Sequence, residues 1–162
     1  MKNLHVVHKK EKYRKIKFRV TRTQHLLIRA EINDIKGDFI LDTGASNSCV
    51  DFSGVEFFGL KAGHSKTKAA GAGATGMFTQ LAKSNKLKIG SWKNNDFHVV
   101  IFDLSHVNQA LMEHKAKPVS GIIGADVLMQ GQAIIDYYNH CLYLKVTGRV
   151  LTDRNHPRKP SN

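Results

Sequence analysis

One segment of the chain places a carboxylate where it could carry out acid–base chemistry. Asp42 follows the apolar run 39–41 and precedes Thr43 and Gly44. A carboxylate at the end of a buried strand is costly unless hydrogen bonds satisfy it, and a glycine lets backbone N–H groups approach closely. The pattern predicts an Asp that is held rigidly and is open from one side. An Asx-type turn that merely closes a hairpin would use the same three residue types.

Two downstream segments extend this pattern. Ile122-Ile123-Gly124 follows about eighty residues later, and Ile134-Ile135-Asp136-Tyr137 comes after it. In this order, with Asp42-Thr43-Gly44-Ala45, they resemble the retroviral-type (retropepsin-like) aspartic proteases, in the form of a single-domain, bacterial-type member. The resemblance covers residues 16–146.

The resemblance implies an aspartic endopeptidase that acts on a peptide or protein substrate. One Asp-Thr-Gly motif per chain implies a homodimer, in which two Asp42 carboxylates activate a water without any cofactor or metal. The residues that it assigns are catalytic Asp42, the supporting Thr43, Gly44, Ala45 and Gly124, and a substrate-binding flap at Gly71, Ala72, Gly73 and Ala74.

Other patterns in the sequence are weaker indications of a functional site. The spacing of Gly71, Gly73 and Gly76 matches a dinucleotide fingerprint, but no buried strand precedes it. The histidines are scattered, so we expect no metal site. Asp136 lacks the Thr-Gly turn and is interpreted as a structural strand residue, and Cys49 as a small core residue.

The elements that must position Asp42 are mostly short strands. They predict a mainly β fold, a small closed barrel-like half of an aspartic protease, with one or two short helices. The expected strands lie at 16–20, 24–32, 38–42, 47–52, 77–82, 86–89, 97–102, 121–124, 133–138 and 141–146. Turn residues 33–37 join the second strand to the third. The expected helices begin at Ser105, as the N-cap, and at Asp126.

Charge divides the chain into a neutral middle and two basic ends. The 162 residues carry a net charge of +12. Residues 1–22 contain nine Lys or Arg and one acidic residue, and residues 145–162 contain five Lys or Arg and one acidic residue. We therefore expect a basic N-terminal arm at 1–15, the protease domain at 16–147, and a basic, flexible tail at 148–162. Such ends either aid solubility or make a weak contact with nucleic acid or another acidic partner.

Composition also bears on location. The sequence contains neither an apolar run long enough to span a membrane nor the apolar core of a signal peptide, and it has only two cysteines. A cytoplasmic protein is expected. Two other functions stay open beside the endopeptidase. One is an inactive dimeric peptide-binding module of the same fold, and the other is a nucleic-acid-associated protein that acts through its basic arm.

Overall fold

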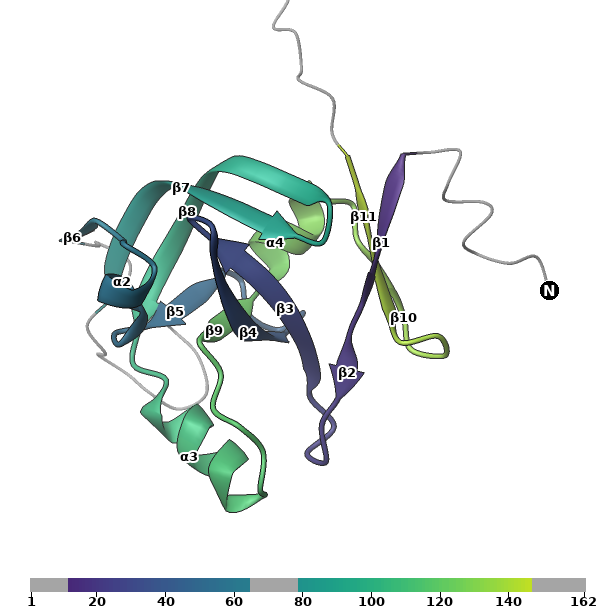
Figure 1. Cartoon of the computed structure of the whole chain (residues 1–162), viewed down its shortest axis with the longest axis horizontal. Helices are drawn as coiled ribbons and strands as arrows, with labels where there is room; N and C mark the ends of the chain where they lie inside the picture. Colours follow the sequence, from purple (N-terminus) through teal and green to yellow (C-terminus); the bar gives the residue numbers. More distant parts are fainter. Residues whose placement is uncertain (1–11, 65–78, 147–162) are drawn as a thin grey trace, which may run out of the picture.

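The computed structural model describes residues 12–64 and 79–146. Its elements form a closed barrel with a smaller sheet beside it (Figure 1). The barrel strands, in the order in which they pair, are β3 (Leu26–Ile32), β4 (Ile35–Leu41), β9 (Gly121–Ile123), β5 (Cys49–Asp51), β8 (Trp92–Phe102) and β7 (Gln80–Ile89). β7 then pairs with β3, which closes the six-stranded barrel. The mainly β, barrel-like fold that the sequence predicts is confirmed.

The first hairpin follows its sequence pattern closely. Burial alternates along β3, and β4 pairs with it from Ile35 to Leu41. The turn is tighter than the expected 33–37, because only Asn33 and Asp34 separate the strands. Both have positive φ, 51° and 68°, which Asn and Asp tolerate and which suits the right-handed twist of a hairpin.

The hairpin of β7 and β8 is much longer than expected. The sequence suggested separate strands at 77–82, 86–89 and 97–102, whereas β7 runs continuously from Gln80 and β8 begins at Trp92. The pairing register shifts around Asn85, where Ser84 has a φ of 57°. Asn85 is buried and accepts a hydrogen bond from Nδ2 of Asn33 at 3.0 Å. The polar residues of this bulge interrupt the apolar pattern, so the sequence predicted two strands where the structure has one continuous strand.

The smaller sheet consists of β1 (Tyr13–Lys17), β11 (Cys141–Lys145) and β10 (Ile134–Asp136), in that order. β1 begins inside the range 1–15 that we assigned to the arm. The indole Nε1 of Trp92 donates to the carbonyl of Lys145 at 3.0 Å. This bond ties the small sheet to the barrel. Two short strands, β2 (Arg19–Val20) and β6 (Ala62–His64), extend the barrel sheet at its edges.

Three short helices complete the described part. They are α2 (Gly54–Phe57), α3 (Ser105–Glu113) and α4 (Ala125–Gln130). α4 was expected, but α2 was not. The expected N-cap of α3 was wrong, because Ser105 is its first residue and Leu104 occupies the cap. The carboxylate of Asp103 instead accepts the Ser105 N–H at 2.9 Å. None of the described helices is both long and apolar enough to cross a membrane.

The main core fills the barrel. Large side chains from each of its six strands are at most 1% exposed: Ile28, Phe39, Val50, Leu87, Ile101 and Ile123. The core holds β4 and β9 in place, and these two strands carry the site described next.

Candidate active site

Asp42 stands immediately beyond the end of a buried strand. β4 pairs in parallel with β9, with Leu41 opposite Ile123. The Asp42 N–H continues this ladder by donating to the Ile123 carbonyl at 3.0 Å. The backbone of Asp42 is thus held by the barrel, and Asp42 as a whole is half-buried. The chain then turns away from the barrel into the loop 42–48.

The turn wraps backbone around the carboxylate. Oδ1 of Asp42 accepts the N–H of Gly44 at 2.8 Å, and the Asp42 carbonyl accepts the N–H of Ala45 at 3.3 Å. Thr43 and Gly44, which form this turn, are exposed. Asp42 is therefore anchored through one carboxylate oxygen and lies at the surface of the described part. The sequence predicts a hydrogen-bonded carboxylate at the end of a buried strand, and the structure has one at this position.

Gly124 lies directly against the loop. A Cβ atom at this position would lie 2.6 Å from the carbonyl oxygen of Ala45 and 3.0 Å from the backbone of Asn47. The first distance is shorter than real Cβ contacts and the second is among the tightest, so a larger residue would push the loop away. The close approach allows the N–H of Ala125 to donate to the Ala45 carbonyl at 2.7 Å. Gly124 thus joins the start of α4 to the turn that holds Asp42.

Two further residues hold the end of the loop, and neither was assigned a role from its sequence context. Ser48 is 1% exposed, and both its N–H and its hydroxyl donate to Oδ1 of Asp126, at 2.9 Å and 2.7 Å. The same hydroxyl accepts the N–H of Gly124 at 2.9 Å. The only local signal is the position of Asp126, two residues after Gly124 in the first turn of α4.

An apolar groove borders the loop. Its volume is about 360 Å³, and it lies between the exposed Thr43, the helix α4 and the strand β10. Six of the seven residues that line it come from the segment 125–135: Ala125, Leu128, Met129, Gln132, Ala133 and Ile135. Met129 is 78% exposed although it is large and apolar.

Two groups that could compete with Asp42 are engaged elsewhere. Oδ1 and Oδ2 of Asp136 accept hydrogen bonds from Asn139, at 2.9 Å and 2.7 Å, and these bonds hold the pKa of Asp136 below its usual value. Burial raises the pKa of the Cys49 thiol to about 12. That thiol is protonated at neutral pH and is no nucleophile.

The remaining predicted site residues are not covered by the structure. Gly71, Ala72, Gly73 and Ala74, the expected flap, lie outside the described residues. The described strands on either side of them pair antiparallel, with His64 opposite Gln80. Within residues 12–64 and 79–146, no group of three or more His, Cys, Asp or Glu is arranged to hold a metal ion.

Comparisons with known proteins agree with this geometry. The family model of the aspartyl proteases matches residues 28–127, which include Asp42, Gly124 and Asp126. No curated protein matches the chain.

Two solved structures share the fold. A retropepsin-like aspartic protease from Rickettsia conorii is 19% identical, with a TM-score of 0.57, and the match covers 83% of this chain and 90% of that one. The retroviral protease-like domain of Ddi1 from Leishmania major is 17% identical, with a TM-score of 0.51, and covers 74% of this chain and 87% of that one. The chain therefore belongs to the aspartyl protease family and has the retropepsin-like fold.

Proposed function

We propose that the protein is an aspartic endopeptidase whose active site forms between two copies of the chain. The observation that carries this proposal is the position and hydrogen bonding of Asp42. It is half-buried, it is held through one oxygen by Gly44, and it stands at an exposed turn. The sequence contains the Asp-Thr-Gly motif once, so a second carboxylate has to come from a second copy.

The chemistry follows from two like carboxylates at contact distance. They cannot both ionise easily, so the pair shares one proton. The ionised Asp42 takes a proton from a bound water, which attacks the carbonyl carbon of the peptide bond. The protonated Asp42 of the other copy hydrogen-bonds the carbonyl oxygen as the centre becomes tetrahedral. This mechanism needs no covalent intermediate between enzyme and substrate.

The apolar groove beside Thr43 supports a second copy as the partner on this face. A second copy that brings its carboxylate to Asp42 has to approach the active-site loop, and the groove touches that loop at Thr43. Its exposed Met129 is the kind of side chain that an interface buries. We therefore place Thr43, Leu128, Met129 and Ile135 in the contact between the two copies.

The test is cleavage of a peptide library by the wild-type chain and by Asp42→Asn. Asn keeps the shape of Asp but cannot act as a base, so we expect folding to be kept and the rate to fall by at least about 100-fold, within the usual range for general acid–base groups. Asp96→Asn is the matched control, because Asp96 is 77% exposed on β8. Its activity should equal that of the wild type. Cleavage by Asp42→Asn near the wild-type rate would remove Asp42 from the mechanism.

A further inference from the structure

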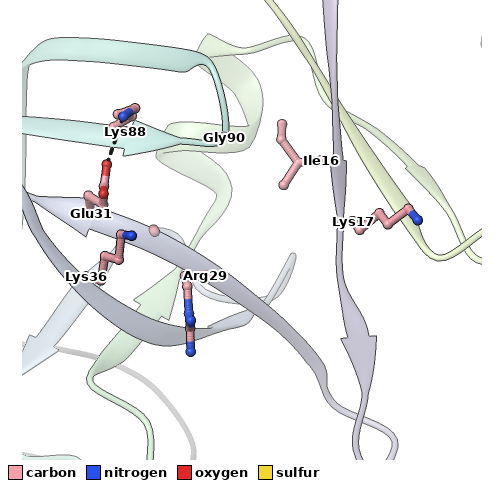
Figure 2. A pocket seen from close by; sticks show the side chains of 8 residues that line it. Ile16, Lys17, Arg29, Glu31, Lys36, Lys88 and Gly90 are labelled. Carbon is pink, nitrogen blue, oxygen red and sulfur yellow. Dashed lines mark ion pairs between the residues drawn. The ribbon is translucent and has the colours of Figure 1, made fainter.

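A second cavity lies away from the candidate active site. It has a volume of about 300 Å³ and is bounded by β1 on one side and by β3, β4 and β7 of the barrel on the other (Figure 2). Lys36 lines it at the start of β4, and Asp42 follows the end of that strand. Asp42 is six positions after Lys36, which in extended chain corresponds to about 20 Å. The cavity and the candidate active site are therefore separate places on the molecule.

Cationic groups from three adjacent strands surround this cavity. Glu31 of β3 stands opposite Lys36 of β4 and opposite Lys88 of β7, and Arg29 is two residues from Glu31 on β3. Because side chains two residues apart share a face of a strand, Arg29 and Glu31 point to the same side. Lys88, Arg29 and Lys36 give three positive charges around one acid.

The single acid neutralises only one of these cations. Oε2 of Glu31 lies 3.1 Å from Nζ of Lys88. Arg29 is 68% exposed and lies 3.4 Å from Asp38, which is a weak surface pair. Within the described residues, no ion pair engages Lys36. Three cations, Arg29, Lys36 and Lys88, thus face two acids, Glu31 and Asp38, and an excess of one positive charge remains at the cavity.

On the opposite wall of the cavity, β1 contributes the apolar Ile16 and also Lys17, and the wall is closely built. Figure 2 shows the side chain of Ile16 on the cavity side of β1, whereas Lys17 extends from the other side of that strand. Gly90 has a φ of 58°, and a Cβ atom there would lie 2.9 Å from Cγ1 of Ile16. Only glycine thus lets the turn between β7 and β8 come this close to β1.

We propose that this cavity binds a small anion of the diphosphate type. The side chains of Lys36 and Lys88 leave strands that are two strand spacings apart, about 10 Å, so two linked phosphoryl groups suit them better than one. The guanidinium of Arg29 presents several donors in a planar fork that matches phosphate oxygens. The phosphoryl groups come either from an inorganic diphosphate or from a nucleoside diphosphate. The wall at Ile16 would contact the organic part of the second.

The test is calorimetric titration of the full chain with sodium pyrophosphate and, separately, with ADP, at constant ionic strength. We expect saturable binding of at least one of the two. Since Lys36 forms no ion pair in the described part of the chain, Lys36→Gln should stay folded and should weaken binding about tenfold, as loss of a charge-assisted hydrogen bond does. Lys36→Arg should restore it. Peptide cleavage by Lys36→Gln should equal that of the wild type, so this result does not depend on the protease assignment.

The control is Lys83→Gln, an exposed lysine that lies outside the cavity on the same strand as Lys88. It should bind as the wild type does. If pyrophosphate and ADP bind equally, the organic part adds nothing and the ligand is assigned as inorganic. If ADP binds more tightly, its organic part is assigned a contact with Ile16. Absence of saturable binding in both titrations, or equal weakening in Lys83→Gln and Lys36→Gln, would overturn the proposal.

Discussion

The hydroxyl of Ser48 lies 2.7 Å from Oδ1 of Asp126, although the two residues are 78 positions apart in the chain. Ser48 ends the loop that Asp42 begins, and Asp126 lies in the first turn of α4. The same hydroxyl accepts the N–H of Gly124. One buried side chain thus connects the candidate catalytic loop, the end of β9 and the helix that follows it.

Ser48→Ala tests this connection. The substitution leaves the Gly124 N–H without its acceptor in a buried site, so we expect the free energy of unfolding to fall by about 1–3 kcal/mol. Cleavage should slow as well, because the loop that carries Asp42 loses an anchor. The measurements are urea unfolding and kcat with one peptide. Ser46→Ala, an exposed serine of the same loop, should change the unfolding free energy by less than about 0.5 kcal/mol. Equal effects of both variants would show that the buried hydroxyl is unimportant.

Gly124→Ala tests how tightly the loop packs on the start of α4. The added Cβ would meet the Ala45 carbonyl at 2.6 Å, and backbone at that distance has to move. We expect a loss of about 1–3 kcal/mol in unfolding free energy, as for an overpacked core, together with a loss of cleavage. Gly63→Ala is the matched control, since within residues 12–64 and 79–146 its Cβ would meet nothing closer than the Leu81 carbonyl oxygen at 3.8 Å. Wild-type stability and activity in Gly124→Ala would contradict the close approach.

Dilution tests the shared active site. A single copy contributes one Asp42, so a monomer should be inactive. Specific activity should therefore fall once the protein concentration drops below the dissociation constant of the dimer, as mass action requires. The measurements are initial rate against protein concentration and sedimentation at the same concentrations. Activity proportional to concentration in a demonstrably monomeric sample would point to a second acid within one chain.

Met129→Lys extends that experiment to the apolar groove. A lysine at this exposed position adds a charge that the proposed interface would have to bury, while the isolated fold barely changes. We expect the dimer to dissociate at a higher protein concentration than in the wild type, and activity to fall in parallel. Met112→Lys, at an exposed methionine of α3, is the control and should dimerise normally. Unchanged dissociation of Met129→Lys would move the interface elsewhere.

Asp51→Asn tests stability at acid pH. Burial alone would raise the pKa of Asp51, but hydrogen bonds from Ser53 and from the N–H of Leu104 outweigh it and hold this pKa below its usual value. A lowered pKa in the folded state stabilises the protein above the unfolded value of about 3.9, and this contribution disappears as the pH falls through the folded value. Unfolding free energies measured from pH 7 to pH 2 should show a deficit in Asp51→Asn at neutral pH that shrinks in acid. A deficit of constant size would exclude a role of the Asp51 charge.

Several features of the site follow from local sequence alone. Asp42 at the end of an apolar run, with glycine two residues later, predicted a strand that delivers a carboxylate to a turn. The structure has this arrangement. The hairpin of β3 and β4 followed from alternation and from turn residues, which act between near neighbours in the chain. The barrel-like fold followed from the number of short strands and from the resemblance carried by Asp42 and Gly124.

Other features depended on contacts between distant parts of the chain. The bulge at Asn85 is stable because Asn33, 52 positions away, hydrogen-bonds its side chain. The alternation of apolar and polar residues is interrupted there, although the strand itself continues. The closure of the barrel by β3 and β7, and the excess charge around Lys36, arise from strand pairing that no local pattern specifies.

The clearest division concerns the loop itself. The sequence determined that an Asp, a Thr and a Gly stand together at the end of a strand, because backbone conformation there depends on adjacent residues. Only the tertiary structure decided that Ser48 and Asp126 hold this loop, because a hydrogen bond between residues 78 positions apart forms only after the barrel has brought β5 beside β9.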